Sequence, residues 1–197
     1  MLTDSTPYFS VKHDFKAYLT PWPDDKPIPS ESELNLMLPL SLQLISDVKS
    51  LEANCLLQLR HLDDEAKTII EYLKLQSKKI DLVLLHILER ETHEGEQHLG
   101  VFFGGSGIRI IGSSLFEIGD TFKITLNIKE ELISLLCFGH VTTTQMVENN
   151  PISTDTQYVT DIVFNRISDI DIEQLVKASL SVQQKQLKQQ KLARKSS

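Results

Sequence analysis

The sequence has little cysteine and no long uninterrupted apolar run. Its two cysteines, Cys55 and Cys137, lie among apolar neighbours, which predicts two buried, reduced thiols rather than a disulfide. Charged residues interrupt each apolar stretch before it reaches the length of a membrane-spanning helix. Residues 1–10 are polar and lack the apolar centre of a secretion signal. These absences predict a soluble cytoplasmic protein with no membrane insertion.

Motifs of catalysis are also scarce. The chain contains no Gly-x-Ser-x-Gly nucleophile elbow, and the Gly-Ser-Gly run at residues 105–107 lacks the lysine of a phosphate-binding loop. His93 and His98, which flank two glutamates, form a polar cluster whose spacing matches no strong metal-ligand motif and is more typical of a solvated loop. We therefore expect no catalytic residue, no metal and no enzymatic activity.

The charge balance is acidic. The chain has 27 acidic and 20 basic residues, which gives a formal net charge of −7. Nucleic acids and anionic membrane surfaces select basic proteins, so general binding to either is not expected. The apolar fraction of 41% is ordinary for a globular protein, and 197 residues are enough for one domain and an additional element.

Two parts of the sequence alternate apolar and polar residues, which is the pattern of half-buried β-strands. The first covers residues 8–19 and is ended by Pro21-Trp22-Pro23, after which a proline-rich linker continues to Pro29. The second follows residue 98 and contains most of the eight glycines. It predicts strands at residues 99–103, 108–111, 121–128, 132–141 and 157–164, a turn at 149–151, and a helix at 169–195. Five or six short strands predict a small antiparallel barrel in an α+β fold.

A long helical segment separates these two parts. Ser30 and Glu33 form a capping box that starts a short helix, and Pro39 fits the first turn of another. Residues 40–91 contain neither glycine nor proline. Alternating spacings of three and four residues connect Ile45, Val48, Glu52, Cys55, Leu59, Leu62, Ala66, Ile69, Leu73, Gln76, Ile80, Val83 and Ile87. A 3.5-residue period of mostly apolar residues is typical of a coiled-coil seam.

This seam predicts self-assembly. A helix over residues 40–91 would reach far beyond the rest of the chain, so its apolar seam needs a partner. Leucine at one seam position and isoleucine at the other favour more than two helices, with Gln76 as a buried polar residue that fixes the register. The alternative is a hairpin that turns near residues 61–64 and buries the seam within one chain. Parallel and antiparallel arrangements of the helices are both open.

The resulting division of the chain has three parts. Residues 1–30 form a strand and a proline-rich linker, residues 31–92 form an oligomerisation insert, and residues 93–197 form the barrel with its C-terminal helix. Because the first strand precedes the insert, we expect the long helix to be inserted into the barrel domain after that strand.

Two segments of the barrel region carry a resemblance to a known family. They are Gly104-Gly105-Ser106-Gly107-Ile108-Arg109-Ile110 and Leu115 to Asp120. They fit the frame of a PilZ domain, in which an (Asp/Asn)-x-Ser-x-x-Gly turn, a strand and a Leu-x-x-Gly-(Asp/Thr) turn follow one another. Residues 164–187 are similar to the family's last strand and C-terminal helix, so the resemblance covers roughly residues 99–190. It implies a small barrel and, as the usual ligand, the bacterial second messenger cyclic di-GMP.

Most residues that the family uses to bind this nucleotide are missing. Alignment on Gly107 puts Phe102 at the Asp/Asn position and Gly104 at the Ser position, and the chain has no Arg-x-x-x-Arg motif. Lys12 and Lys16 have that spacing but lack the forked geometry of a guanidinium. The candidates for a weaker or altered site are Ser106, Gly107, Arg109, Lys12 and Lys16.

These departures, together with the long insert, resemble a divergent PilZ subgroup of proteobacteria in which a coiled coil joins four chains. The resemblance implies a non-enzymatic adaptor that forms a homo-oligomer, a tetramer in that subgroup. It would dock an unidentified protein in cyclic di-GMP signalling, with the usual nucleotide binding lost and no cofactor. One alternative is a receptor that binds cyclic di-GMP at a different site near Arg109 and the first strand. Otherwise Ser106 and Arg109 are an exposed turn residue and an exposed strand residue.

Overall fold

The computed structural model describes residues 10–40, 42–44, 48, 51, 55, 67–90, 93–147 and 156–195. The chain divides into two compact units. One combines Met1–Leu34 with His93–Ser197, and the other is Asn35–Thr92. The barrel and the C-terminal helix belong to the first unit, and the helical insert makes up the second.

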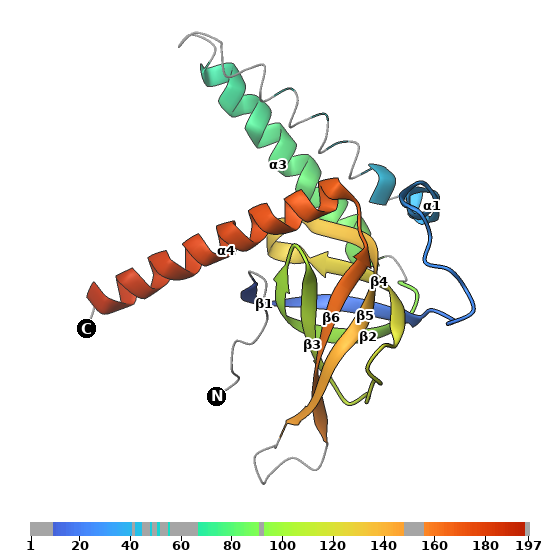
Figure 1. Cartoon of the computed structure of the whole chain (residues 1–197). Coiled ribbons are helices and arrows are strands. Elements are labelled where there is room, and N and C mark those ends of the chain that lie inside the picture. The colour runs from blue at the N-terminus through green and yellow to red at the C-terminus, as the bar shows by residue number, and fades with distance from the viewer. Residues whose placement is uncertain are drawn as a thin grey trace. The chain divides into compact units, whose positions relative to one another are not determined.

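Six antiparallel strands form a closed barrel in the order β1-β2-β3-β6-β5-β4 (Figure 1). They are β1 (Val11–Pro21), β2 (Glu96–Gly104), β3 (Gly107–Gly112), β4 (Thr121–Ile128), β5 (Ile133–Val147) and β6 (Gln157–Arg166). The predicted small barrel is confirmed. β5 continues past the predicted end at residue 141, because its second half pairs with β6 as far as Val147. Residues 8–9 and the expected turn at 149–151 lie outside the described residues.

The period-two alternation of the strands fills the barrel. In β4, the even-numbered residues from Phe122 to Ile128 are buried in the core, whereas the odd-numbered residues between them are partly exposed. Aromatic side chains from β1 and β2 meet there, with the rings of Phe15 and Phe103 in edge contact at 5.9 Å between centroids. The removal of these apolar side chains from water is the main stabilising contribution to the barrel.

Gly100 in β2 leaves room for the Phe15 ring. A β-carbon placed at Gly100 would overlap the outer atoms of that ring, which itself is 4% exposed. We expect Gly100→Ala to lower the free energy of unfolding by about 1–3 kcal/mol through overpacking. Urea titration measures the change. The shorter side chain of a Phe15→Leu background is expected to reduce the cost of Gly100→Ala, and an equal cost in both backgrounds would contradict this packing.

The proline-rich segment after β1 packs on the outside of the barrel and is therefore more than a linker. The Trp22 backbone N–H donates to the carbonyl of Thr121 at 2.8 Å. Its indole ring meets the Phe138 ring in edge contact, with 4.9 Å between centroids. Phe138 faces outward from β5, next to core residue Cys137, and is nevertheless fully buried.

Helix α4 (Asp169–Lys195) closes one end of the barrel. It begins with a second capping arrangement, in which the Asp171 N–H donates to Ser168 Oγ at 3.1 Å and Ser168 Oγ donates to the Asp171 carboxylate at 2.8 Å. Leu175, Ala178 and Val182 lie on its buried face and belong to the barrel core. The predicted C-terminal helix is confirmed at the expected bounds.

The insert begins with the predicted capping box. The Ser30 N–H donates to Glu33 Oε2 at 2.7 Å, and the Glu33 N–H donates to Ser30 Oγ at 3.4 Å, at the start of α1 (Glu31–Met37). The long described helix of the insert is α3 (Lys67–Arg90), and residues 40, 42–44, 48, 51 and 55 are also helical. The possible hairpin turn and the seam positions Leu59, Leu62 and Ala66 lie outside the described residues.

The seam positions of α3 are exposed in the single chain. Ile69, Leu73, Ile80, Val83 and Ile87 have exposed fractions between 46% and 62%. Gln76 is half-buried. α3 therefore presents a row of apolar side chains that its own chain leaves in contact with water.

The two cysteines differ in their surroundings. Both are free thiols, and Cys137 is buried as predicted. The prediction is wrong for Cys55, which is exposed on a helical residue of the insert. Burial, and to a smaller extent the charge of Asp171, raises the pKa of the Cys137 thiol well above its ordinary value. Among the described helices, none combines the length and the apolar character needed to cross a membrane.

Candidate functional site

A lateral row of outward-facing residues crosses five strands of the barrel. Strand register pairs Lys12 of β1 with Phe102 of β2, Phe102 with Arg109 of β3, Arg109 with Asp161 of β6, and Asp161 with Thr143 of β5. The neighbours of Arg109 in sequence, Ile108 and Ile110, belong to the core, so alternation turns Arg109 to the outer face. The barrel thereby collects candidate residues that are far apart in sequence.

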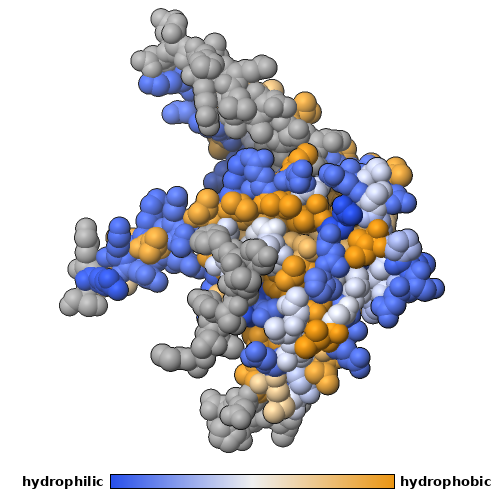
Figure 2. All heavy atoms as spheres, in the orientation of Figure 1, coloured by the Kyte–Doolittle hydropathy of each residue, from blue (hydrophilic) through white to orange (hydrophobic). Residues whose placement is uncertain are grey.

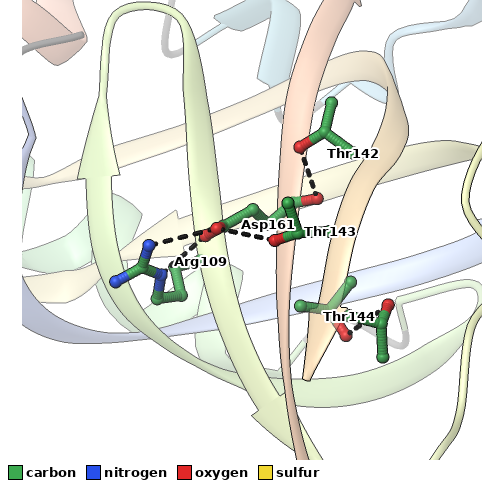
Figure 3. Close-up of polar contacts among 6 residues, drawn as sticks. Arg109, Thr142, Thr143, Thr144 and Asp161 are labelled. Carbon is green, nitrogen blue, oxygen red and sulfur yellow. Dashed lines mark hydrogen bonds and ion pairs between the residues drawn. The ribbon is translucent and has the colours of Figure 1, made fainter. Parts of the chain in front are cut away.

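Arg109 and Asp161 form a forked ion pair at the centre of this row (Figure 3). Arg109 Nε lies 2.6 Å from Asp161 Oδ1, and an Arg109 Nη lies 3.1 Å from Oδ2. The two side chains are only 7% and 16% exposed. The Phe102 ring lies under the guanidinium, 5.3 Å from its centroid to the guanidinium carbon. This is the bidentate geometry in which an arginine binds a carboxylate or phosphate most strongly.

Threonines of β5 hold Asp161 in place. Thr143 Oγ1 donates to Asp161 Oδ2 at 2.9 Å, and Thr142 Oγ1 donates to the Asp161 backbone carbonyl at 3.2 Å (Figure 3). The carboxylate thus accepts from both Arg109 and Thr143. A carboxylate of the protein occupies the fork that a ligand phosphate would need.

The other residues that the sequence suggests for a ligand site lie on β1 or at the connection between β2 and β3. Lys12 and Lys16 are exposed on β1, and Lys12 stands in the row beside Phe102. Ser106 lies in the turn from β2 to β3, where its carbonyl accepts from the Phe164 N–H at 2.9 Å, and Gly107 is the first residue of β3. The turn is closely packed, because a β-carbon at Gly107 would overlap the Ile162 carbonyl of β6.

The alternative that Arg109 is an exposed strand residue is wrong, because Arg109 is 6% exposed and forms an ion pair with Asp161. Its partner Asp161 was missed, although a signal exists in the sequence. Asp161 is the one charged residue of the stretch Tyr158 to Phe164, where it stands among apolar residues and threonine. A lone acid in a buried strand indicates a paired charge, because an unpaired buried carboxylate is costly.

His98 lies inside the barrel domain rather than in a solvated loop, so that expectation is wrong. It is 5% exposed, its ring meets Phe116 in edge contact at 5.4 Å, and Nε2 has no hydrogen-bond partner in the described structure. A β-carbon at Gly112 would lie 2.9 Å from its Nδ1, so glycine makes room for the ring. His93 instead packs on the Tyr18 ring at 4.3 Å. Within the described chain, no group of three His, Cys, Asp or Glu side chains is arranged to hold a metal.

Burial of His98 predicts a loss of stability in acid. Desolvation lowers the pKa of His98 below its ordinary 6.5, and the charge of Glu96 opposes this shift in part. Below about pH 6.5, His98 binds a proton in the unfolded chain but stays neutral in the folded chain. The free energy of unfolding therefore falls as the pH drops toward the pKa of His98 in the folded state. Urea titrations at pH 7.5 and 5.5 measure the fall. We expect His98→Gln to show a smaller fall, and an equal fall in both proteins would contradict the role of His98.

The chain is similar in structure to PilZ proteins. A pathogenic Xanthomonas campestris protein, described as a tetrameric PilZ domain self-assembled via an unusual helical bundle, matches at 12% identity with a TM-score of 0.53. The match covers 90% of this chain and 89% of that chain. This likeness concerns the fold, and the fold of the barrel unit is that of a PilZ domain. The barrel architecture implied by the resemblance is therefore confirmed.

Two further solved structures match about half of the chain. K. pneumonia MrkH in its apo state is 10% identical, with 48% of this chain and 43% of that chain covered and a TM-score of 0.43. The PilZ domain of Escherichia coli YcgR with c-di-GMP is 13% identical, with 48% and 77% covered and a TM-score of 0.40. No family model and no curated protein matches the sequence.

Proposed function

We propose that this chain is a non-enzymatic PilZ-type adaptor that assembles through its helical insert and docks other proteins in cyclic di-GMP signalling. In this proposal the family's usual nucleotide site is lost, and the assembly is a homotetramer. The observation that supports the proposed assembly most directly is the row of exposed apolar side chains on α3. Five large seam side chains in 24 residues of helix are roughly half exposed in one chain, which is more than a lone surface helix needs to show.

The Xanthomonas protein supports the proposed assembly. Its solved form is tetrameric through a helical bundle, and the match covers most of both chains. An assembly of several barrels would also strengthen the docking of a partner, because linked weak contacts act together without any new contact.

The state of Arg109 supports the loss of nucleotide binding. A ligand phosphate would have to displace Asp161 from a fork with a 2.6 Å contact and leave a buried carboxylate without its cation. The outward neighbour in β2 is Phe102, which offers no acceptor or donor in place of the family's Asp or Asn.

Calorimetric titration with cyclic di-GMP tests this part of the proposal. We expect no heat of micromolar binding with tens of micromolar protein. Arg109→Lys provides the comparison, because it keeps the charge and removes the fork. Micromolar binding by the natural chain that weakens at least tenfold in Arg109→Lys would overturn the proposed loss of the site.

A second candidate function is a receptor with an altered nucleotide site. It is favoured by the exposure of Lys12 and Lys16 on the same side of the barrel domain as Phe102. If the receptor function holds, Lys12→Ala with Lys16→Ala should abolish cyclic di-GMP binding and leave the urea midpoint unchanged, because both side chains are exposed. Binding that survives in this double variant would exclude a site at these lysines.

A further inference from the structure

Charge is distributed unevenly along this acidic chain. All 27 acidic residues lie before Gln174, whereas Gln174 to Lys195 contains basic residues and no acid. The basic residues of this stretch are Lys177, Lys185, Lys188, Lys191, Arg194 and Lys195. The second part of α4 is therefore a concentrated positive charge on a protein whose net charge is −7.

This part of α4 extends beyond the barrel (Figure 1). The last core residue of the helix is Val182. Beyond it, Lys185 binds Glu131 at 2.6 Å, and Gln186 donates to the Lys12 carbonyl at 2.6 Å. More than two turns of helix follow Gln186. Figure 2 shows this extension as mainly hydrophilic.

An apolar stripe nevertheless runs from the part of α4 on the barrel into the extension. Leu180 and Leu187 are 45% and 49% exposed and stand seven residues apart, on the side of the helix away from Val182. Lys191 is one turn beyond Leu187, and Arg194 is two turns beyond it on the same face. The extension thus offers leucines and cations together, which is the surface of a docking helix for an acidic apolar partner.

The loop between β3 and β4 has the complementary character. Leu115 and Ile118 of this loop are 65% and 75% exposed. Two exposed carboxylates, Glu96 and Glu117, accompany them, and Asp120 adds a third acid that accepts from the Glu117 N–H at 2.8 Å. We name residues 113–120 with Glu96 the acidic loop.

One chain cannot bring these two surfaces together. α4 packs where β3 begins, with Val176 against Gly105, and Lys185 binds Glu131 just after β4 ends. The acidic loop lies before β4 begins, at the other end of the barrel. The eight residues of β4 separate the two ends by roughly 25 Å at about 3.3 Å per residue.

We propose that the α4 extension docks on the acidic loop of a second copy of this chain. Charge complementarity favours the acidic loop over the insert as the docking site. α3 carries five basic and three acidic residues and would repel a basic helix. The contact joins two different surfaces of the chain, so it is head-to-tail. Repeating it adds one copy after another and does not form a closed dimer. It is small and electrostatic, so it is weak and salt-dependent.

Carbodiimide cross-linking of mixed labelled and unlabelled full-length chains tests the contact. This reagent joins a lysine amine directly to a carboxylate that touches it. We expect mixed-isotope peptides that link Lys188 or Lys191 to Glu96 or Glu117, and we expect them to disappear in about 0.5 M salt, where screening is strong. Links from these lysines to Glu71 or Asp81 of α3 instead, or an absence of mixed-isotope links, would overturn the proposal.

A charge exchange separates the contact from general charge effects. The variant Lys188→Glu with Lys191→Glu should lose at least tenfold in cross-link yield, and so should Glu96→Lys with Glu117→Lys. Mixing the two variants should restore the yield, because each supplies the surface that the other needs. Failure of the mixture to recover would overturn the proposal. The contact does not involve α3, so it should persist in Leu73→Asp whether or not the assembly proposed above exists.

Discussion

In place of the proposed assembly, the variant Leu73→Asp should give a species with the 22.4 kDa mass of one chain. Leu73 is a seam residue of α3 and is 46% exposed when the chain is alone. A carboxylate at this position therefore meets water in the monomer but would be buried among apolar side chains in a helical bundle. Burying an unpaired charge costs several kcal/mol per chain, and a tetramer accumulates that cost at each seam. Light scattering after gel filtration measures the mass.

Leu75→Asp is the matched control for this variant. Leu75 is 52% exposed on the same helix, and two residues along an α-helix turn the side chain by about 200°, away from the seam. The Leu75 variant should keep the mass of the natural protein, and circular dichroism should show equal helix content in both variants. Equal masses for the two variants would mean that the 3.5-residue register misidentifies the contacting face.

Asp161→Ala should lower the free energy of unfolding by about 3–5 kcal/mol, the usual cost of leaving one member of a buried ion pair alone. Arg109 would keep its charge in a place where its side chain is 7% exposed, without the carboxylate that now accepts from two of its nitrogens. Thr143 would lose its acceptor as well. Urea unfolding followed by tryptophan fluorescence measures the loss, because Trp22 packs on the barrel at Phe138.

The double variant Arg109→Met with Asp161→Ala is the control for this ion pair. Removing both charges removes the buried unpaired cation, so the double variant should be more stable than Asp161→Ala alone. If the double variant is instead less stable than Asp161→Ala by the full cost of Arg109→Met, the two residues act independently and the pair is not the cause.

Much of the barrel could be predicted from local sequence. Alternation identifies β4 at its observed bounds, because its even-numbered residues from Phe122 to Ile128 face the core and the residues between them do not. The capping box at Ser30 and the bounds of α4 follow equally from short-range patterns. Such features depend on residues within one or two turns of each other.

The candidate site depends on pairings that local patterns do not contain. Arg109 and Asp161 are 52 residues apart and meet only because β3 lies beside β6 in the closed barrel. His98 is likewise covered by Phe116, which comes from the loop between β3 and β4. The residues next to His98 in sequence are polar and therefore indicated a solvated loop. Register across nonlocal strands decides which charges are paired, and a single sequence does not give that register.

For the insert, the sequence predicts the seam but does not identify which helix packs against it. The same period serves a bundle of several chains and a hairpin within one chain, and the residues that would form the hairpin turn lie outside the described ranges. The exposure of Ile69, Leu73 and Ile80 favours a partner from outside the chain, because a seam covered within the hairpin would be hidden from water.

The mass of the natural full-length chain in about 0.5 M salt tests the proposed assembly most directly. At this salt concentration the electrostatic contact of the α4 extension is screened, whereas an apolar seam is retained. Assembly through the insert predicts a single species at four times 22.4 kDa across tens of micromolar protein. A mass of 22.4 kDa over the same concentrations would contradict it and would place the seam within one chain.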